Sequence, residues 1–310
     1  MVEVERYKHL NNFLKNKFGE RTLKICIDGN FTCPNRDGTK GTGGCIFCSE
    51  KGSGDHIKKE NTIKKQVEDY FNSYKSQRAN KFIIYFQNFT NTYDSIENLK
   101  LKYDEAMCDK RIVALAVATR PDCINEDIAK LLSTYASKYY VWVELGLQSA
   151  NDFIGEKINR KYNTMDFSNA VKILRKYNID IVSHIMVGLP GEEIKDIYET
   201  VDFLNNQNIQ GIKIHSCYIV KNTVLEQMYK NGEYTPITLE YYLNVLKIIL
   251  THINPNFIIH RISGDAPESL LIAPEWNIHK KWVINGIDKI MKEENLYQGM
   301  YFKGNLNIEK

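Results

Sequence analysis

Three cysteines near the N-terminus have the residue type and the spacing that metal chemistry requires. Cys33, Cys45 and Cys48 lie in TCPNRDGTKGTGGCIFCS, in the pattern C-x₁₁-C-x₂-C. Three thiolates on one loop can ligate three irons of a four-iron four-sulfur (4Fe-4S) cluster and leave the fourth iron open to a non-protein ligand. S-adenosylmethionine (SAM) needs such an open iron to chelate a cluster and be cleaved reductively. The spacing therefore predicts a 4Fe-4S loop with SAM as second cofactor.

The residues around the cysteines favour this interpretation but leave one alternative open. Four glycines give the loop the backbone freedom to wrap an inorganic core: Gly38, Gly41, Gly43 and Gly44. Phe47 is expected to shield the cluster or to approach an adenine. The alternative is a structural zinc knuckle with Cys26 as its fourth ligand, because C-x₂-C is also a zinc spacing. Cys26 lies in LKICID, however, which has the pattern of a buried strand.

The composition bounds the class of protein. The chain has 310 residues, 43% of them hydrophobic, and a net charge of +3, which suits one large α/β domain with an extension or two small domains. The mild charge neither requires nor excludes nucleic acid. No secretory signal or membrane-spanning run is evident, and seven cysteines do not form a disulfide pattern. We therefore expect no membrane partner and a reducing cytoplasm, which protects an oxygen-sensitive cluster.

Strand-like and helix-like segments alternate along the chain. Apolar, β-rich runs cover residues 23–28, 81–86, 112–118, 139–145, 179–187 and 211–217, and helical patterns cover 62–77, 95–108, 125–137, 166–177 and 192–206. Six such units predict an α/β fold, a partial (β/α)₆ TIM-type barrel, with functional groups at the carboxyl ends of its strands.

The remaining segments flank that barrel. We expect an N-terminal helix over 4–17 within residues 1–20, the partial barrel over 21–217, and a C-terminal extension over 218–310. The extension should contain helices near 239–251 and 279–294 and a short strand at 257–261. No Gly/Ser-rich linker separates it, so it is expected to pack on the barrel.

Polar side chains follow the predicted strands where a barrel site would lie. Gln87 ends the second strand, and Arg120 follows the third. Arg120 can anchor a carboxylate or phosphate, or form a local ion pair with Asp122. After the short strand of the extension, Arg261 and Asp265 form a charged group that can close the barrel mouth.

The fourth, fifth and sixth strands carry polar residues within apolar runs. Glu144 lies inside VWVELGLQS, where a carboxylate is costly unless it is paired or liganded. It is therefore a functional candidate or a member of a barrel-internal ion pair. Gln148 can hydrogen-bond ribose hydroxyls. His184 and His215 are strand histidines that are either functional or satisfied core residues.

Six motifs together carry a family resemblance. FTCPNRDGTKGTGGCIFC, YFQNFTNTY, ATRPDC, VELGLQS, GLPGE and RISGDAP occur in this order over nearly the whole chain. The sequence resembles radical SAM enzymes of the YhcC/YtqA type, a group related to the Elongator catalytic subunit. The resemblance implies a partial barrel, a 4Fe-4S cluster, SAM, and an electron from a flavodoxin- or ferredoxin-like donor.

The resemblance also assigns residues by motif. It implies that Gln148 binds the SAM ribose and that Arg160, twelve residues later, binds the SAM carboxylate. Related coproporphyrinogen-oxidase-type enzymes place an aspartate four residues before the glycine of GLP, and this chain has His184 there. Gln87 and Glu144 are further candidates for contacts with SAM.

The YtqA subgroup implies a substrate. Its members are associated with the tRNA wobble uridine and the conversion of carboxymethylaminomethyluridine to aminomethyluridine. We expect Arg120, Arg261 and Asp265 at that substrate, with three aromatic side chains to stack on bases: Phe89, Tyr93 and Trp276. The alternatives are a radical SAM enzyme acting on a small metabolite and a non-catalytic, zinc-containing RNA-binding protein.

Overall fold

A single curled sheet organises the molecule. The computed structural model describes residues 5–50, 52, 62–264 and 266–304. Seven parallel strands lie in the order β1-β2-β3-β4-β5-β6-β8, with the bounds β1 Thr22–Ile27, β2 Lys81–Phe86, β3 Ile112–Thr119, β4 Tyr140–Gln148, β5 Asp180–Val187, β6 Gly211–Ser216 and β8 Ile258–Arg261. The first six strands are the six predicted runs. The α/β partial-barrel prediction is confirmed.

The seventh strand corrects the predicted strand number. β8 was expected as a short strand of an extension, but it pairs in parallel with β6 through Gly211 opposite Ile258 and Ile212 opposite Ile259. Ile258 and Ile259 are buried, so the strand contributes apolar side chains to the core like the other six. The sheet therefore continues past residue 217. A separate pair of short strands, β7 Ile219–Val220 and β9 Leu271–Ala273, is antiparallel.

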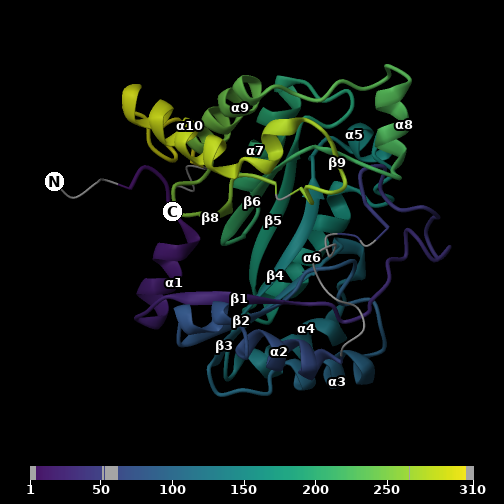
Figure 1. Cartoon of the computed structure of the whole chain (residues 1–310), viewed down its shortest axis with the longest axis vertical. Helices are drawn as coiled ribbons and strands as arrows, with labels where there is room; N and C mark the ends of the chain where they lie inside the picture. The colour runs from purple at the N-terminus through teal and green to yellow at the C-terminus, as the bar shows by residue number, and fades with distance from the viewer. Residues whose placement is uncertain (1–4, 51, 53–61, 265, 305–310) are drawn as a thin grey trace, which may run out of the picture.

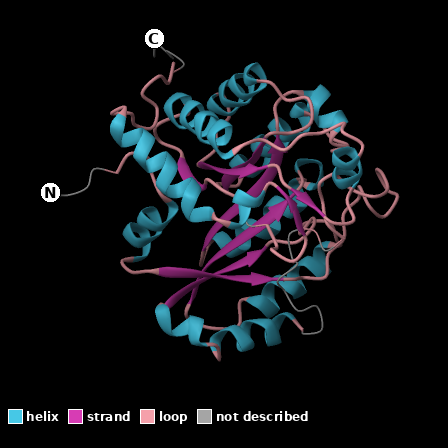
Figure 2. Cartoon of the chain, turned by 45° about the horizontal axis from the view of Figure 1, so that its top comes forward, coloured by secondary structure: helices cyan, strands magenta, loops and turns pink. Residues whose placement is uncertain are grey.

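Most of the helices cover the outer face of the sheet (Figures 1 and 2). Their bounds are α1 Leu10–Phe18, α2 Ile63–Phe71, α3 Ile96–Ala106, α4 Glu126–Ala136, α5 Asp152–Lys157, α6 Thr164–Lys176, α7 Ile194–Asn205, α8 Val224–Lys230, α9 Leu239–His252 and α10 Lys280–Glu293, with 3₁₀ turns at Tyr74–Arg78, Pro121–Cys123 and Glu275–Ile278. One large core of buried apolar side chains joins the strands to these helices. No helix within the described residues is long and apolar enough to cross a membrane.

Helix α1 is shorter than predicted and lies at one end of the barrel. The predicted helix over 4–17 begins only at Leu10, because the preceding residues run alongside β8: Ile259 N–H donates to Lys8 O at 2.8 Å. Gly19 ends the helix at φ 77°, a left-handed conformation that glycine adopts easily. Leu10 and Leu14 pack with Trp142 and Val182 in a second, smaller core.

Candidate cluster loop and barrel pocket

The three motif cysteines lie on one irregular loop after β1. Backbone hydrogen bonds fold the loop tightly: Arg36 N–H donates to Cys33 O at 2.8 Å, and Cys48 N–H to Cys45 O at 3.0 Å. All three cysteines are half-buried. Gly43 and Gly44 have φ values of 79° and 81°, so the glycine-rich stretch uses the left-handed backbone expected of it.

The segment after α5 holds this loop in place. Ile46 N–H donates to Ile158 O at 3.1 Å, and the Asn159 side chain donates to Gly44 O at 2.8 Å. In the other direction, Asn35 Nδ2 donates to Asn159 O at 2.6 Å. Because Asn35 is fully buried, these bonds form away from water and fix the loop against the barrel.

The charges around the thiols favour bound metal. The hydrogen bond between the two thiols lowers the pKa of Cys48 to about 7 and raises the pKa of Cys45, and the nearby Arg36 guanidinium also lowers the Cys48 pKa. Arg120 lies next to Cys33, with Nη1 4.0 Å from its sulfur. Thiolates are the ligand form of cysteine, and the two guanidinium groups offset their negative charge. The donor set therefore fits an iron–sulfur cluster bound by three cysteines.

The predicted zinc alternative lacks its fourth ligand in this geometry. Cys26 packs within the barrel interior rather than on the loop. Burial there raises its thiol pKa, although the charges of Lys24 and Lys213 act in the opposite direction. Among the described residues, no three His, Cys, Asp or Glu side chains are close enough together to share a single metal ion. A 4Fe-4S cluster does not require this, because each thiolate binds a different iron.

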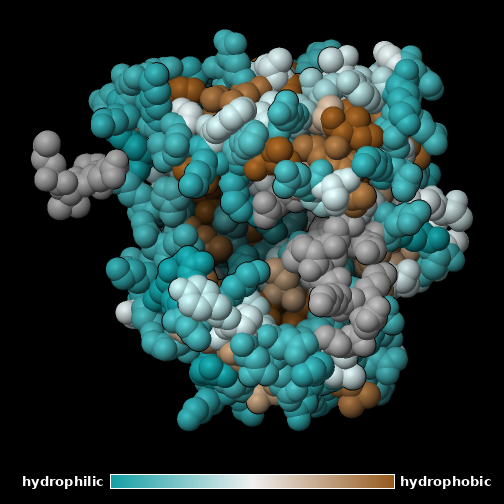
Figure 3. Space-filling model, viewed as in Figure 1, coloured by the Kyte–Doolittle hydropathy of each residue, from teal (hydrophilic) through white to brown (hydrophobic). Residues whose placement is uncertain are grey.

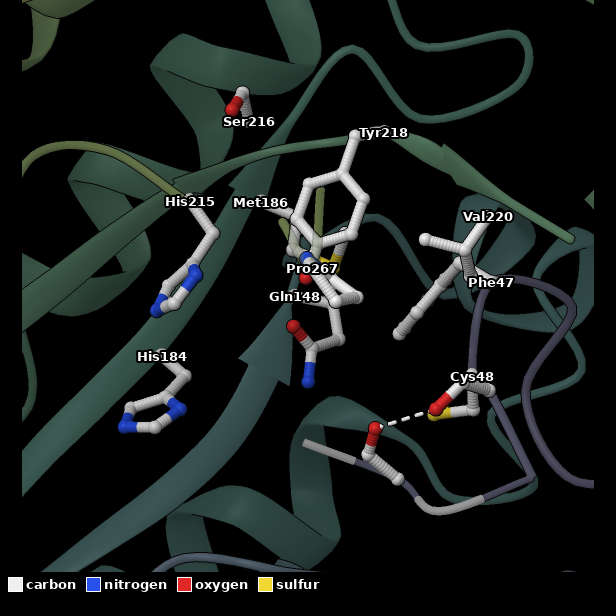
Figure 4. Close-up of a pocket in the computed structure, with 12 residues that line it drawn as sticks. Phe47, Cys48, Gln148, His184, Met186, His215, Ser216, Tyr218, Val220 and Pro267 are labelled. Atoms are coloured by element: carbon white, nitrogen blue, oxygen red, sulfur yellow. Dashed lines mark hydrogen bonds between the residues drawn. The ribbon is translucent and has the colours of Figure 1, made fainter. Parts of the chain in front are cut away.

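A cavity separates the cysteine loop from the barrel strands. Its volume is about 700 Å³ including its open mouth, and it is lined by Phe47, Cys48, Ser49, Gly52, Gln148, His184, Met186, His215, Ser216, Tyr218, Val220 and Pro267. Figure 4 shows Phe47 and Cys48 on one wall and the histidines of β5 and β6 on the other. Figure 3 shows that this face of the molecule is hollowed, with apolar side chains at depth. The structure thus brings together the predicted residues Phe47, Gln148 and His184.

Gln148 has an unusual backbone at the end of β4. Its φ is 67°, and the pairing of β4 with β5 shifts register between Gly146 and Gln148. A Cβ on Gly146 would lie 2.9 Å from Gln148 Nε2, so glycine leaves the side chain its space. A non-glycine residue in this conformation costs about 1 kcal/mol or more and is often found at functional sites. The bulge directs Gln148 into the cavity (Figure 4).

Glu144 lies beneath the cavity and does not line it. Its side chain is fully buried in the barrel interior. Five side chains donate hydrogen bonds to its carboxylate: Tyr85 Oη (2.7 Å), Lys213 Nζ (2.9 Å), His184 Nε2 (2.6 Å), Trp142 Nε1 (3.1 Å) and Lys24 Nζ (3.4 Å). Burial alone would raise the Glu144 pKa, but the charges of Lys213 and Lys24 hold it well below its usual value. Glu144 therefore forms the barrel-internal ion pair that was one of its two predicted roles, with Lys213 and Lys24 as the cationic partners.

His184 connects the Glu144 network to the cavity. Burial and the charge of Lys213 lower the His184 pKa to about 4, so the ring is neutral near pH 7. An ionised carboxylate can only accept, so Nε2 carries the proton donated to Glu144, and Nδ1 is an acceptor. The ring of His215 lies 5.8 Å away, and its Nε2 is buried without a partner among the described residues. Sequence reasoning did not single out Lys24 and Lys213, although each is a charge inside an apolar strand.

Arg160 is buried and contacts protein groups. Nε donates to Tyr162 O at 3.0 Å, Nη1 to Leu147 O and to Ser149 O at 2.7 Å, and Nη2 to Asp152 at 2.7 Å. It does not line the cavity, so it joins the end of β4 to the segment that holds the cysteine loop. Its predicted contact with the SAM carboxylate stays a prediction.

Arg120 forms the ion pair that was the alternative to a substrate contact. Its Nε and Nη2 each donate to Asp122 at 2.9 Å, and Nη1 donates to Arg160 O at 3.1 Å. Lys40 also donates to Asp122, at 2.6 Å. The Arg120 guanidinium is therefore directed to the cysteine loop and to Asp122.

The other predicted residues are spread around the barrel. Gln87 follows β2 and is half-buried outside the cavity lining; Arg261 ends β8, near enough to lower the pKa of buried Lys213. Asp265 lies outside the described residues. Phe89 and Tyr93 are half-exposed.

The predicted base-stacking role of Trp276 is wrong. Its ring is only 7% exposed, stacks on Tyr242 at 5.1 Å, and donates from Nε1 to Ile237 O at 3.1 Å. It is a core residue of the C-terminal segment.

A buried carboxyl group in the turn after β5 predicts a pH effect. Glu192 Oε2 accepts from Gly188 N–H at 2.7 Å, Oε1 has no partner among the described residues, and burial raises the pKa to about 8. A folded-state pKa above the usual 4.5 gives stability that is present at low pH and lost as pH rises to about 8. The free energy of unfolding of Glu192→Gln, relative to that of wild type, should therefore increase as pH rises from 5 to 9. Each unit of pKa shift in the folded state corresponds to roughly 1.4 kcal/mol.

Urea unfolding at several pH values measures this difference. Gln keeps an oxygen acceptor for the Gly188 N–H and carries no ionisable group. Glu199→Gln, which removes an exposed carboxyl on the following helix α7, is the control and should show a pH-independent difference. A flat Glu192→Gln difference over the same range would contradict the raised pKa.

Comparisons with known proteins decide the family. The Radical SAM superfamily model matches residues 37–204, and the Radical_SAM C-terminal domain model matches residues 209–293. The chain belongs to the radical SAM superfamily. This radical SAM protein is 36% identical to YtqA of Bacillus subtilis over 96% of its own length and 94% of that protein. The resemblance drawn from the motifs is confirmed.

Two further relatives connect this radical SAM protein to Elongator-type proteins. It is 29% identical to a tRNA uridine(34) acetyltransferase of Methanocaldococcus infernus, over 63% of its own length and 34% of that protein. In structure it resembles Methanocaldococcus infernus Elp3 lacking residues 1–46, with a TM-score of 0.67 at 18% identity. That likeness covers 89% of this chain and 64% of Elp3, and it shows a shared fold.

Proposed function

We propose that this radical SAM enzyme modifies the wobble uridine of tRNA in the cytoplasm, converting carboxymethylaminomethyluridine to aminomethyluridine. The observation that carries the enzyme class is the cavity between Cys48 and the strand ends of β4, β5 and β6. The tRNA assignment rests on relatives: the acetyltransferase named above acts, by its name, on uridine 34 of tRNA. A flavodoxin- or ferredoxin-like protein would supply the electron.

The chain's own residues would position the cofactors. Cys33, Cys45 and Cys48 would hold the 4Fe-4S cluster through their thiolates. Gln148 offers an amide for the SAM ribose, and Phe47 offers an aromatic face beside the cluster loop (Figure 4). When bound, the cluster supplies the electron that cleaves SAM into methionine and a 5′-deoxyadenosyl radical.

His184 and the cavity walls prepare the site for the substrate. Neutral His184 presents Nδ1 as a hydrogen-bond acceptor, because Glu144 fixes the proton on Nε2. A ring held in this way does not need to reorient when a hydroxyl or amine reaches it. The cysteine loop and the strand ends enclose the reacting groups and limit the access of water.

Metal and product analysis tests the enzyme class. Anaerobic reconstitution of the full chain should give about four irons per chain and 5′-deoxyadenosine that depends on SAM and a reductant. A single bound zinc without iron under the same conditions would defeat the proposal.

Nucleoside mass spectrometry tests the substrate. In tRNA from a strain lacking this gene, the carboxymethylaminomethyl form should accumulate and the aminomethyl form should fall. A wild-type profile in an organism without a second such enzyme would favour the small-metabolite alternative. In vitro, tRNA binding should weaken as salt rises, because phosphate contacts release counterions.

Gln148→Ala should weaken SAM binding about tenfold, since it removes side-chain hydrogen bonds worth roughly 1–1.5 kcal/mol. Equilibrium dialysis of SAM against the reconstituted protein measures this, with iron content recorded in parallel. Gln87→Ala is the matched control, because Gln87 also follows a strand but does not line the cavity. Unchanged SAM affinity in Gln148→Ala would remove Gln148 from the binding site.

A further inference from the structure

Two buried side chains lie against the sulfurs of the cysteine loop, and neither has a role in the proposed function. Asn35 Nδ2 is 3.9 Å from Cys45 Sγ, and Arg120 Nη1 is 4.0 Å from Cys33 Sγ. Both distances are at the long end of the range for N–H···S hydrogen bonds, which are longer than N–H···O bonds because sulfur is larger. Asn35 is fully buried and Arg120 is 7% exposed, so water competes little with either contact.

The orientation of the Asn35 amide is determined by its surroundings. The amide atom 2.6 Å from Asn159 O must be the nitrogen, because a carbonyl oxygen can only accept. Its second proton is then free to be directed at Cys45 Sγ. On the other side, Asn35 Oδ1 faces Gly41 so closely that a Cβ there would collide with it. The amide cannot turn over without losing the Asn159 contact.

The orientation of the Arg120 guanidinium group is also fixed by its surroundings. Asp122 binds its Nε and Nη2 in a bidentate pair, both at 2.9 Å, which leaves Nη1 for Arg160 O and Cys33 Sγ. A bidentate pair fixes the plane of a guanidinium group. Lys40 also pairs with Asp122, at 2.6 Å. Lys40, Asp122 and Arg120 thus form a row of alternating charges that ends at the Cys33 sulfur.

We propose that Asn35 and Arg120 raise the reduction potential of the cluster by donating hydrogen bonds to the sulfurs of Cys45 and Cys33. Reduction adds negative charge, part of which falls on the ligand sulfurs. Donors at those sulfurs stabilise the reduced state more than the oxidised state. Both side chains act through the ligands, so they are positioning residues, and Arg120 is assigned here rather than to the substrate. The inference rests on the cluster of the proposed function.

Potentiometric titration of the reconstituted full chain, followed by electron paramagnetic resonance, tests this inference. Asn35→Ala and Arg120→Met should each shift the midpoint potential to a more negative value. Arg120→Lys keeps the positive charge but loses the directed Nη1 contact, and should shift it less than Arg120→Met. Asn159→Gly is the matched control: it removes the bond to Gly44 O, suits the φ of 56°, and does not contact a sulfur. Its potential should match wild type.

The outcomes separate this inference from the proposed function. Variants that bind full iron with the wild-type potential would overturn the tuning role. So would loss of iron from Asn35→Ala and both Arg120 variants while Asn159→Gly keeps it, because these residues would then serve cluster assembly. Absence of iron from the wild-type protein would instead defeat the proposed function itself.

Discussion

Cys45→Ala should lower bound iron from about four ions per chain to almost none and abolish the formation of 5′-deoxyadenosine. Two thiolates cannot hold three irons, and Asn35, a side chain next to the Cys45 sulfur, presents its amide nitrogen, which is not an iron ligand. Iron analysis after anaerobic reconstitution measures the first effect, and product chromatography measures the second.

Cys123→Ala is the control that makes this result specific. Cys123 lies in the turn beside Asp122, and burial raises its thiol pKa to about 12, so it stays protonated near pH 7. A protonated thiol is a poor metal ligand, and the variant should keep its full iron content. Loss of iron in Cys123→Ala as well would show that the motif cysteines are not the whole ligand set.

Glu144→Leu should lower the free energy of unfolding by about 3–5 kcal/mol, the usual cost of removing one partner from a buried ion pair. The substitution leaves Lys213 buried, with Tyr85 Oη as its remaining partner at 2.8 Å. It also removes the acceptor for His184 Nε2. Urea unfolding of the protein, monitored by circular dichroism, measures the change.

A second substitution separates lost charge pairing from lost packing. Lys213→Met removes the buried ammonium group that Glu144 neutralises, so the double variant Glu144→Leu/Lys213→Met should regain part of the stability lost by Glu144→Leu alone. If the double variant is less stable than the sum of the two single effects predicts, the Glu144 network is not held mainly by this charge pair.

The regular elements were predictable because their signals are local. Apolar runs such as KFIIYF at β2 and helix N-caps such as Asn125 depend on neighbours a few residues away. β8 was recognised as a strand, but its place beside β6 was not. Sequence separation conceals pairing between distant segments, and the break in alternation after β6 suggested that the sheet had ended.

The site was predictable where a motif fixes the chemistry and not where partners come from distant strands. The cysteine loop and Gln148 were read from spacing and position. The base-stacking role predicted for Trp276 is wrong because its partners, the Tyr242 ring and Ile237 O, come from distant segments that no local pattern shows. For the same reason the sequence does not reveal that Arg160 bonds to main-chain oxygens and to Asp152, while its predicted contact with SAM stays a prediction. Lys24 in LKICID and Lys213 in GIKIHS were the available signal for the Glu144 network, because a lysine in a buried strand requires an anion.

Contacts between the first and the last segments of the described chain constrain folding during synthesis. Arg6 donates to Asn295 at 2.9 Å across 289 positions, and Gln298 N–H donates to Arg6 O at 2.8 Å. Residues 6–9 therefore cannot take their final place until β8 and the segment after α10 have left the ribosome. Until then, the barrel end that α1 covers stays open. The cysteine loop is translated early, so the three predicted cluster ligands leave the ribosome before the segments that close this end of the barrel.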